Sequence, residues 1–275
     1  MRSILVPVSD RPESAKALNT AFTLGKSLGA SITGCHIRPH RYSDVSLSTA
    51  FADADWRRKN NSKTPQAARD LYEQIAGRYG YEVANRARVA PTALWQEKVG
   101  SPEIIMGIVG PVTDLVVVTR PAKRRSVADM FMVSALLQSA SPVLVLPKAA
   151  KRVIGKRIVI AWNQSSEAAR TVRLSLPILA AADEVTIVSC GSEDQPGPKS
   201  MQLANYLKQW GIKSTRENTR GRHIEAELLN ACKDRSADLV VAGAYSRSRW
   251  RERVFGGTTQ VMLYQSRLPL LTLHT

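Results

Sequence analysis

The sequence predicts an α/β protein made of two tandem Rossmann-like or flavodoxin-like domains, each a five-stranded parallel sheet with helices on both faces. One observation is an internal repeat, because residues 2–10 align with residues 156–164 and Glu13 then aligns with Glu167. The other is that continuously apolar runs alternate with amphipathic segments along the chain. Parallel strands covered on both faces by crossover helices require this pattern.

Each copy of the repeat begins with a strand, a turn and an amphipathic helix. The apolar positions of this helix recur at the spacing i, i+3, i+7 and i+10, which is one helix face: Ala15, Leu18, Phe22 and Gly25 in the first copy, and Ala169, Val172, Leu176 and Leu179 in the second. The later strands are expected as matched pairs at residues 31–37 and 184–190, 82–89 and 212–219, 114–119 and 238–243, and 143–146 and 270–273.

The domain boundary is expected in the short basic connector 148–155, which gives domains at 1–148 and 154–275. Such a short connector keeps the two domains close, and we expect them to pack as a pseudo-twofold pair. The copies differ most after their second strand, where a long connection, Arg38–Thr64, replaces a short one, Gly191–Lys199. A connection of this length is either a lid or binding loop or a disordered insertion, and we expect it to be the most mobile part of the chain.

Composition excludes several classes of protein. No apolar run approaches the roughly 18 residues of a membrane span, and the N-terminus lacks a signal-peptide pattern, so a cytoplasmic protein is expected. The three cysteines have no CxxC spacing, and no metal-binding motif is present. The net charge of +16 is shared equally by the two halves, and its basic clusters lack interleaved aromatic residues. Nucleic-acid binding is therefore not favoured.

The end of the apolar run 237–242 carries the strongest binding signal. Gly243 ends that run, and Gly256 and Gly257 precede a predicted helix with Thr258 and Thr259 at its start. Ligands of open α/β sheets bind beyond the carboxyl ends of the strands, where glycines and helix N-termini accept phosphate groups. The stretch 243–259 is therefore either a phosphate-binding turn or only a basic loop.

Residues 237–259, together with 158–170, resemble the universal stress protein family in its tandem form. The nucleotide motif of that family is a glycine, two residues, a second glycine, nine residues, and a glycine followed by small or hydroxyl residues. The resemblance implies that the fifth strands of the two domains meet. It also implies a stress-response protein that binds or senses ATP or ADP, with Mg²⁺ as a possible companion ion, and that works through regulation or protein partners.

Carried over position by position, the motif places Gly243 and Gly256 at the first and third glycines, but Ser246 at the second. Asn163 stands where the family has an acidic residue that contacts adenosine. Both departures weaken the expected affinity, since serine disfavours positive φ and asparagine lacks the charge. The resulting candidate nucleotide-binding set is Asn163, Ala242, Gly243, Ser246, Arg247, Gly256, Gly257, Thr258 and Thr259.

The first copy departs further from the motif. Its corresponding turn, 119–129, contains no glycine, and Ser9 replaces the acidic residue. The first domain is therefore interpreted as a degenerate partner domain. We expect no membrane association; the internal pseudo-dimer leaves room for a homodimer.

No catalytic or metal-binding set is recognisable, so an enzyme is not predicted, although slow ATP hydrolysis stays compatible with the sequence. Two alternatives to the nucleotide-binding function stay open. One is an interaction module of the same family without nucleotide, and the other is a nucleic-acid-associated basic protein.

Overall fold

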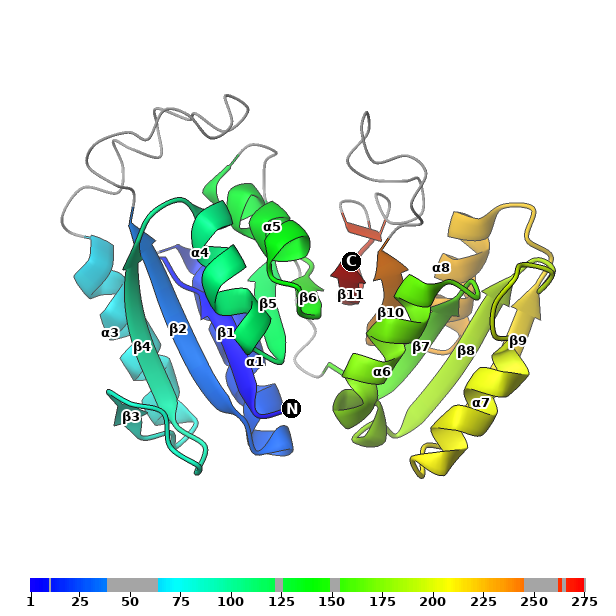
Figure 1. Ribbon diagram of the computed structural model, residues 1–275, viewed down its shortest axis with the longest axis horizontal. Coiled ribbons are helices and arrows are strands. Elements are labelled where there is room, and N and C mark those ends of the chain that lie inside the picture. The colour runs from blue at the N-terminus through cyan, green and yellow to red at the C-terminus, as the bar shows by residue number, and fades with distance from the viewer. Residues whose placement is uncertain are drawn as a thin grey trace. The chain divides into compact units, whose positions relative to one another are not determined.

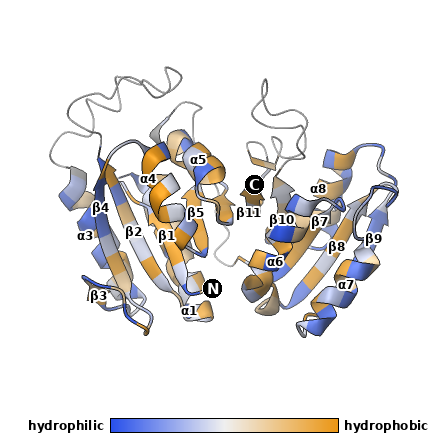
Figure 2. Ribbon diagram, viewed as in Figure 1, coloured by the Kyte–Doolittle hydropathy of each residue, from blue (hydrophilic) through white to orange (hydrophobic). Residues whose placement is uncertain are grey.

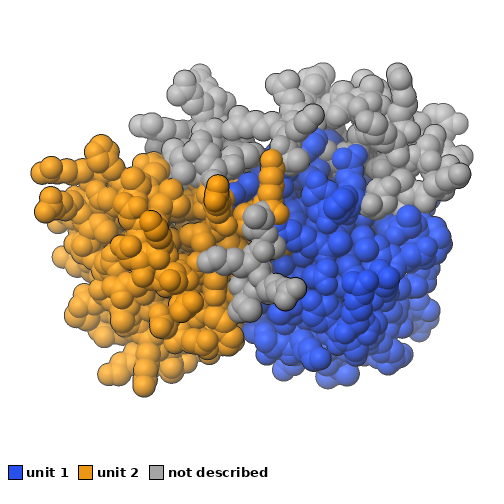
Figure 3. All heavy atoms as spheres, turned by 180° about the vertical axis from the view of Figure 1, so that it is seen from behind, with its two compact units in different colours: residues 1–141 blue, residues 142–275 orange. Residues whose placement is uncertain are grey.

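The computed structural model describes residues 1–9, 11–38, 64–121, 126–148, 154–244, 262–263 and 266–274. The chain divides into two compact units, residues 1–141 and 142–275, which are coloured separately in Figure 3 and are called unit 1 and unit 2 below. Most of the long connection 38–64 lies outside the described residues.

Unit 1 contains a parallel sheet with the strand order β3-β4-β2-β1-β5 (Figure 1). Strands β2, β3 and β4 lie on one side of β1, and β5 lies on the other side. The strand order therefore reverses between β1 and β5, which are parallel neighbours at this switch point. The strands are β1 (Ser3–Pro7), β2 (Ser31–Arg38), β3 (Val83–Ala84), β4 (Ala93–Val99) and β5 (Leu115–Thr119).

The helices of unit 1 cover both faces of this sheet. Helices α1 and α3 pack together on one face, and α4 and α5 pack together on the other, in front of the strands in Figure 1. They span α1 (Pro12–Leu28), α3 (Thr64–Arg78), α4 (Pro102–Val109), which continues into the 3-10 turn η1 (Gly110–Val112), and α5 (Val127–Gln138).

One predicted strand of unit 1 is wrong. The expected strand 82–89 is reduced to the two residues of β3, whereas β4, which was not predicted, pairs with β2 along its whole length. The sequence of β4, ALWQEKV, mixes apolar and charged residues because the strand is only half-buried. Trp95 fixes the strand in place, because its ring packs beside that of Tyr72, with ring centroids 5.4 Å apart, over Gly34, which has no side chain. Tertiary packing, and not the local sequence, therefore determines this strand.

Unit 2 repeats the arrangement with the strand order β6-β11-β10-β7-β8-β9. All neighbouring strands are parallel except β6 and β11, the fifth strands of the two sequence repeats, which pair antiparallel. The strands are β6 (Val143–Leu146), β7 (Arg157–Trp162), β8 (Glu184–Cys190), β9 (Thr215–Thr219), β10 (Leu239–Ala244) and β11 (Leu270–His274), and the helices are α6 (Ser166–Ala180), α7 (Ser200–Gln209) and α8 (Ile224–Asp234).

The core of each unit follows the apolar runs that predicted the strands. Strand β5 is buried at every residue, and so are the first three residues of β10. Figure 2 shows the central strands of unit 1 mainly in the hydrophobic colour. The predicted α/β architecture with mostly parallel strands is therefore confirmed, and the carboxyl ends of β1, β5, β7 and β10 are held on rigid elements.

Candidate functional site

The carboxyl ends of β7 and β10 lie side by side in unit 2. These strands are parallel neighbours, and Ala242 is in register with Ala161. Asn163 follows β7 directly, and Gly243 is the next residue of β10, so the pairing brings these two predicted site residues to the same edge. Ser246, Arg247, Gly256, Gly257, Thr258 and Thr259 lie outside the described residues, and their role stays a prediction.

Asn163 forms the turn that starts helix α6. Its Oδ1 accepts hydrogen bonds from the Ser165 hydroxyl at 2.7 Å and from the Ser165 backbone N–H at 3.3 Å. Ser165 is in turn the N-cap, because its Oγ accepts a hydrogen bond from the backbone N–H of Ala168. The exposed Asn163 thus stands at a capped helix N-terminus, which carries a partial positive charge.

Gly243 has a packing role in the described structure. A Cβ built at this residue would collide with the backbone of the first turn of α6, at 2.8 Å from the Glu167 carbonyl carbon and still closer to the Ala168 nitrogen. Only a residue without a side chain allows α6 to rest directly on β10. The space beside Gly243, which was predicted to accommodate a phosphate group, is therefore occupied by the first turn of α6.

A buried carboxyl group lies behind this contact. Glu167, in the first turn of α6, is buried, and its carboxylate accepts a hydrogen bond from the Ser166 hydroxyl. His274 of β11 is in register with Ala244 of β10. Partial burial lowers the pKa of His274, while the Glu167 carboxylate acts in the opposite direction.

Gln164 is an important residue of this edge that sequence reasoning missed. Its backbone has φ of 61°, in the left-handed region, and its side chain is buried. The Nε2 group donates hydrogen bonds at 3.1–3.2 Å to three backbone carbonyls of the β8–α7 connection: those of Glu193, Gln195 and Gly197.

The same connection is attached at two further points. The Trp162 indole N–H donates to the Pro198 carbonyl at 2.8 Å. Gly197 lies so close to the Gln164 backbone that no side chain fits there. The segment 193–198 is therefore fastened to the β7–α6 turn and forms one wall of the unit 2 edge.

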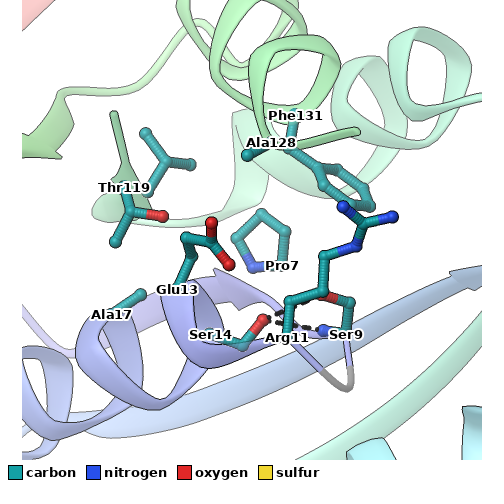
Figure 4. Close-up of a pocket in the computed structure, with 10 residues that line it drawn as sticks. Pro7, Ser9, Arg11, Glu13, Ser14, Ala17, Thr119, Ala128 and Phe131 are labelled. Atoms are coloured by element: carbon teal, nitrogen blue, oxygen red, sulfur yellow. Dashed lines mark hydrogen bonds between the residues drawn. The ribbon is translucent and has the colours of Figure 1, made fainter. Parts of the chain in front are cut away.

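The corresponding edge of unit 1 contains a small hollow. It encloses about 30 Å³, roughly the volume of one water molecule and far below that of a ligand pocket. Figure 4 shows Glu13 of α1 and Thr119 of β5 on its walls. Its lining residues are Pro7, Ser9, Arg11, Glu13, Ser14, Ala17, Val118, Thr119, Ala128 and Phe131.

Polar contacts organise one side of this hollow. The Ser9 backbone N–H donates to Ser14 Oγ at 2.9 Å, so Ser9, which replaces the acidic residue of the motif, is bonded to the first turn of α1. Arg120 follows Thr119 and is buried, which lowers its pKa to about 10. Burial, and secondarily the charge of Arg120, lower the pKa of Lys16 to about 8.

Neither a metal site nor a membrane span is present in the part of the chain that the structure describes. The residues that the structure describes contain no group of three or more His, Cys, Asp or Glu side chains able to hold a metal ion. None of the helices within the described ranges is long and apolar enough to cross a membrane.

The model of the universal stress protein family matches residues 191–274 of this chain. Residues 191–274 belong to the universal stress protein family. The match includes β10, with Gly243, and the fastened β8–α7 connection. The resemblance predicted from the sequence is thereby confirmed, whereas a search of curated proteins gives no match.

Three solved structures share the fold over nearly the whole chain. A universal stress protein from Archaeoglobus fulgidus is 14% identical, with a TM-score of 0.70, and the match covers 98% of this chain and 97% of the other. A functionally unknown protein from Pseudomonas aeruginosa is 15% identical, with a TM-score of 0.59 and coverages of 99% and 92%. A putative universal stress protein of that species is 15% identical, with a TM-score of 0.58 and coverages of 99% and 93%.

Proposed function

We propose that this universal stress protein binds one adenine nucleotide, ATP or ADP, at the carboxyl edge of unit 2 and acts in a cytoplasmic stress response through protein partners. Family membership supports the stress-response role. The observation that carries the nucleotide proposal is the pairing of β7 with β10, because it joins Asn163 to the strand that leads into the motif 243–259.

The chemistry of this edge suits a nucleotide. The N-terminus of α6 presents a partial positive charge beside Asn163. The Asn163 oxygen is used by Ser165, so its amide N–H groups are the donors offered to a purine or ribose. Backbone N–H groups at Gly256 and Gly257 and the hydroxyls of Thr258 and Thr259 would bind the phosphates, with Mg²⁺ screening their charge.

Unit 1 offers a different environment at the equivalent place. Thr119 stands where unit 2 has Gly243, and the hollow beside it has the volume of about one water molecule. Its following turn lacks the glycines of the motif. The proposal therefore assigns the nucleotide to unit 2 alone.

Calorimetry with ATP and ADP tests this proposal. We expect one nucleotide per chain, binding that is lost in Gly256→Leu, and tighter binding in Ser246→Gly, which restores the motif. Replacing Lys123, Arg124 and Arg125 of unit 1 by alanine is the matched control and should leave the stoichiometry unchanged. Binding that survives Gly256→Leu but disappears in the unit 1 variant would disprove the assignment.

An interaction module without nucleotide is the second candidate. It is favoured by the engagement of the Asn163 oxygen within its own turn. Mass spectrometry of small molecules released from the denatured protein separates the two candidates. A retained adenine nucleotide supports the first candidate. Binding of ATP by Ser246→Gly but not by the natural chain, measured by calorimetry, favours the second.

A further inference from the structure

Helix α4 of unit 1 carries apolar side chains on its outer face. Ile104, Ile108 and Val112 are 45%, 63% and 79% exposed, and they are spaced i, i+4, i+8 along α4 and η1. Ile105 and Met106 of the same helix are buried against the unit, so α4 is apolar on both sides, as its colour in Figure 2 shows. We call Ile104, Gly107, Ile108 and Val112 the α4 ridge.

The equivalent helix of unit 2 shows what a solvated face looks like in this fold. Helix α8 leads into β10 as α4 leads into β5, and it buries Leu228, Ala231 and Cys232. Apart from Ile224 at its first residue, its exposed positions carry small, polar or charged residues: Ala226, Asn230, Lys233 and Asp234. The apolar face of α4 is thus not imposed by the fold, and large exposed apolar surfaces mark contacts with another molecule.

The near absence of charge on the ridge indicates which kind of molecule it contacts. Residues 101–112 contain one charged residue, Glu103, and neither lysine nor arginine, in a chain of net charge +16. Nucleic acids and anionic membranes are recognised through lysine and arginine. An interface with a second copy of this chain instead requires a surface without lysine and arginine, because two copies that meet through basic surfaces repel each other. Self-association therefore favours this uncharged face.

Gly107 gives the ridge a shape that fits a copy of itself. It is exposed in the middle of the ridge, and among the residues that the structure describes the nearest atom to a Cβ built there is Gln138 Cβ, at 4.0 Å. A glycine between Ile104 and Ile108 leaves a shallow gap in which an isoleucine of a second ridge can rest. A twofold interface needs such a self-complementary surface, with a projection and a recess on the same element.

We propose that the α4 ridge is the centre of an interface through which two copies of this chain form a homodimer, with α4 packed on α4 of the other copy. Charged substitution at the ridge has a doubled effect, because the symmetry places both new charges in one interface. The inference is independent of nucleotide binding, since the ridge belongs to unit 1 and contains none of the proposed site residues.

Analytical ultracentrifugation of the full chain tests the proposal. We expect a dimer for the natural protein, and for Ile108→Lys a dissociation constant raised at least about 100-fold, because like charges then face each other. Gly107→Leu should also weaken the dimer by filling the recess, and open space at this residue lets it fold normally. Leu174→Lys is the matched control, since Leu174 is a 47% exposed apolar residue of α6, and it should remain dimeric.

Two results would overturn the proposal. A natural protein that is monomeric at every accessible concentration shows that another molecule, or nothing, covers the ridge. A dimer that persists in Ile108→Lys and Gly107→Leu, with circular dichroism showing that both are folded, places the dimer interface elsewhere.

Discussion

The β1–α1 turn of unit 1 and the β7–α6 turn of unit 2 occupy the same position in the repeat but are packed differently. In unit 2, α6 rests on the bare Gly243 of β10. In unit 1, the equivalent residue is Thr119, and a hollow of about 30 Å³ separates it from the start of α1. The side chain at this one position, near the end of the strand, thus determines how closely the following helix approaches the strand.

The neighbouring connections add a second difference. The β8–α7 connection of unit 2 is fastened by Gln164 and Trp162, whereas its counterpart in unit 1 is the long stretch that begins after Arg38. Unit 2 therefore has a fixed wall at its edge. Duplicated domains with one topology can in this way keep one preorganised edge while the other diverges.

The largest expected effect comes from adding a side chain at Gly243. Gly243→Val forces its Cβ into the backbone of Glu167 and Ala168, and backbone cannot move aside as a side chain can. We expect a loss of about 3 kcal/mol in the free energy of unfolding, measured by urea denaturation.

Thr119→Val is the matched substitution in unit 1. It keeps a side chain that the hollow already accommodates, and we expect a change below about 1 kcal/mol. An equal decrease in the free energy of unfolding for Gly243→Val and Thr119→Val would mean that the packing difference between the two turns does not affect stability.

The next effect concerns the fastened wall. Gln164→Gly removes three hydrogen bonds, which contribute about 1 kcal/mol each, but relieves the positive φ, worth about 1 kcal/mol or more. We expect a net loss of about 1–2 kcal/mol and faster hydrogen exchange at residues 193–198. Gln164→Asn tolerates the same backbone but is too short to reach the carbonyls, so it should behave alike. Unchanged exchange in both variants would show that the Gln164 side chain does not hold residues 193–198 in place.

The smallest expected effect on stability depends on pH and concerns the N-termini of α4 and α8, the helices that lead into β5 and β10. Helix α4 is capped by Ser101, which does not titrate. In the first turn of α8, the Glu227 carboxylate accepts hydrogen bonds from the backbone N–H groups of the three residues that precede the helix, Gly221, Arg222 and His223. The nearby Thr219 hydroxyl and these N–H groups lower the pKa of Glu227 to about 2, from an ordinary value of 4.5.

A lowered folded-state pKa stabilises the protein above pH 4.5, and this contribution is lost as the pH falls from 4.5 towards 2. Glu227→Gln should therefore flatten the acid limb of the stability curve in that window and slightly weaken the 219–223 turn at neutral pH. Ser101→Ala, the counterpart in unit 1, should lower stability equally at all pH values. An acid limb that is unchanged in Glu227→Gln would contradict the role of this carboxylate.

The sequence predicted those features that depend on repetition and continuous burial. The runs around Val116 and Val240 are buried strands because parallel strands covered on both faces must be apolar throughout. Strand β4 was missed because Gln96, Glu97 and Lys98 hide its pairing with β2, which depends on Trp95 and Tyr72 from distant positions.

Side-chain roles at the site were less predictable. Glutamine is not a residue that signals positive φ, so the conformation of Gln164 depends on carbonyls about 30 positions away that the sequence does not connect to it. Gly243 was expected to end β10 and lies one residue before its end, at Ala244, but its contact with α6 arises only from helix packing. The part of the motif from Ser246 to Thr259 lies outside the described residues and stays a prediction.

Hydrogen exchange measured by mass spectrometry with and without ATP tests most directly whether unit 2 alone is the nucleotide-binding unit. We expect ATP to protect the peptides that contain Asn163 and residues 239–259, while residues 3–9 and 115–121 of unit 1 exchange at unchanged rates. Protection confined to the unit 1 peptides, or equal protection in both units, would contradict it.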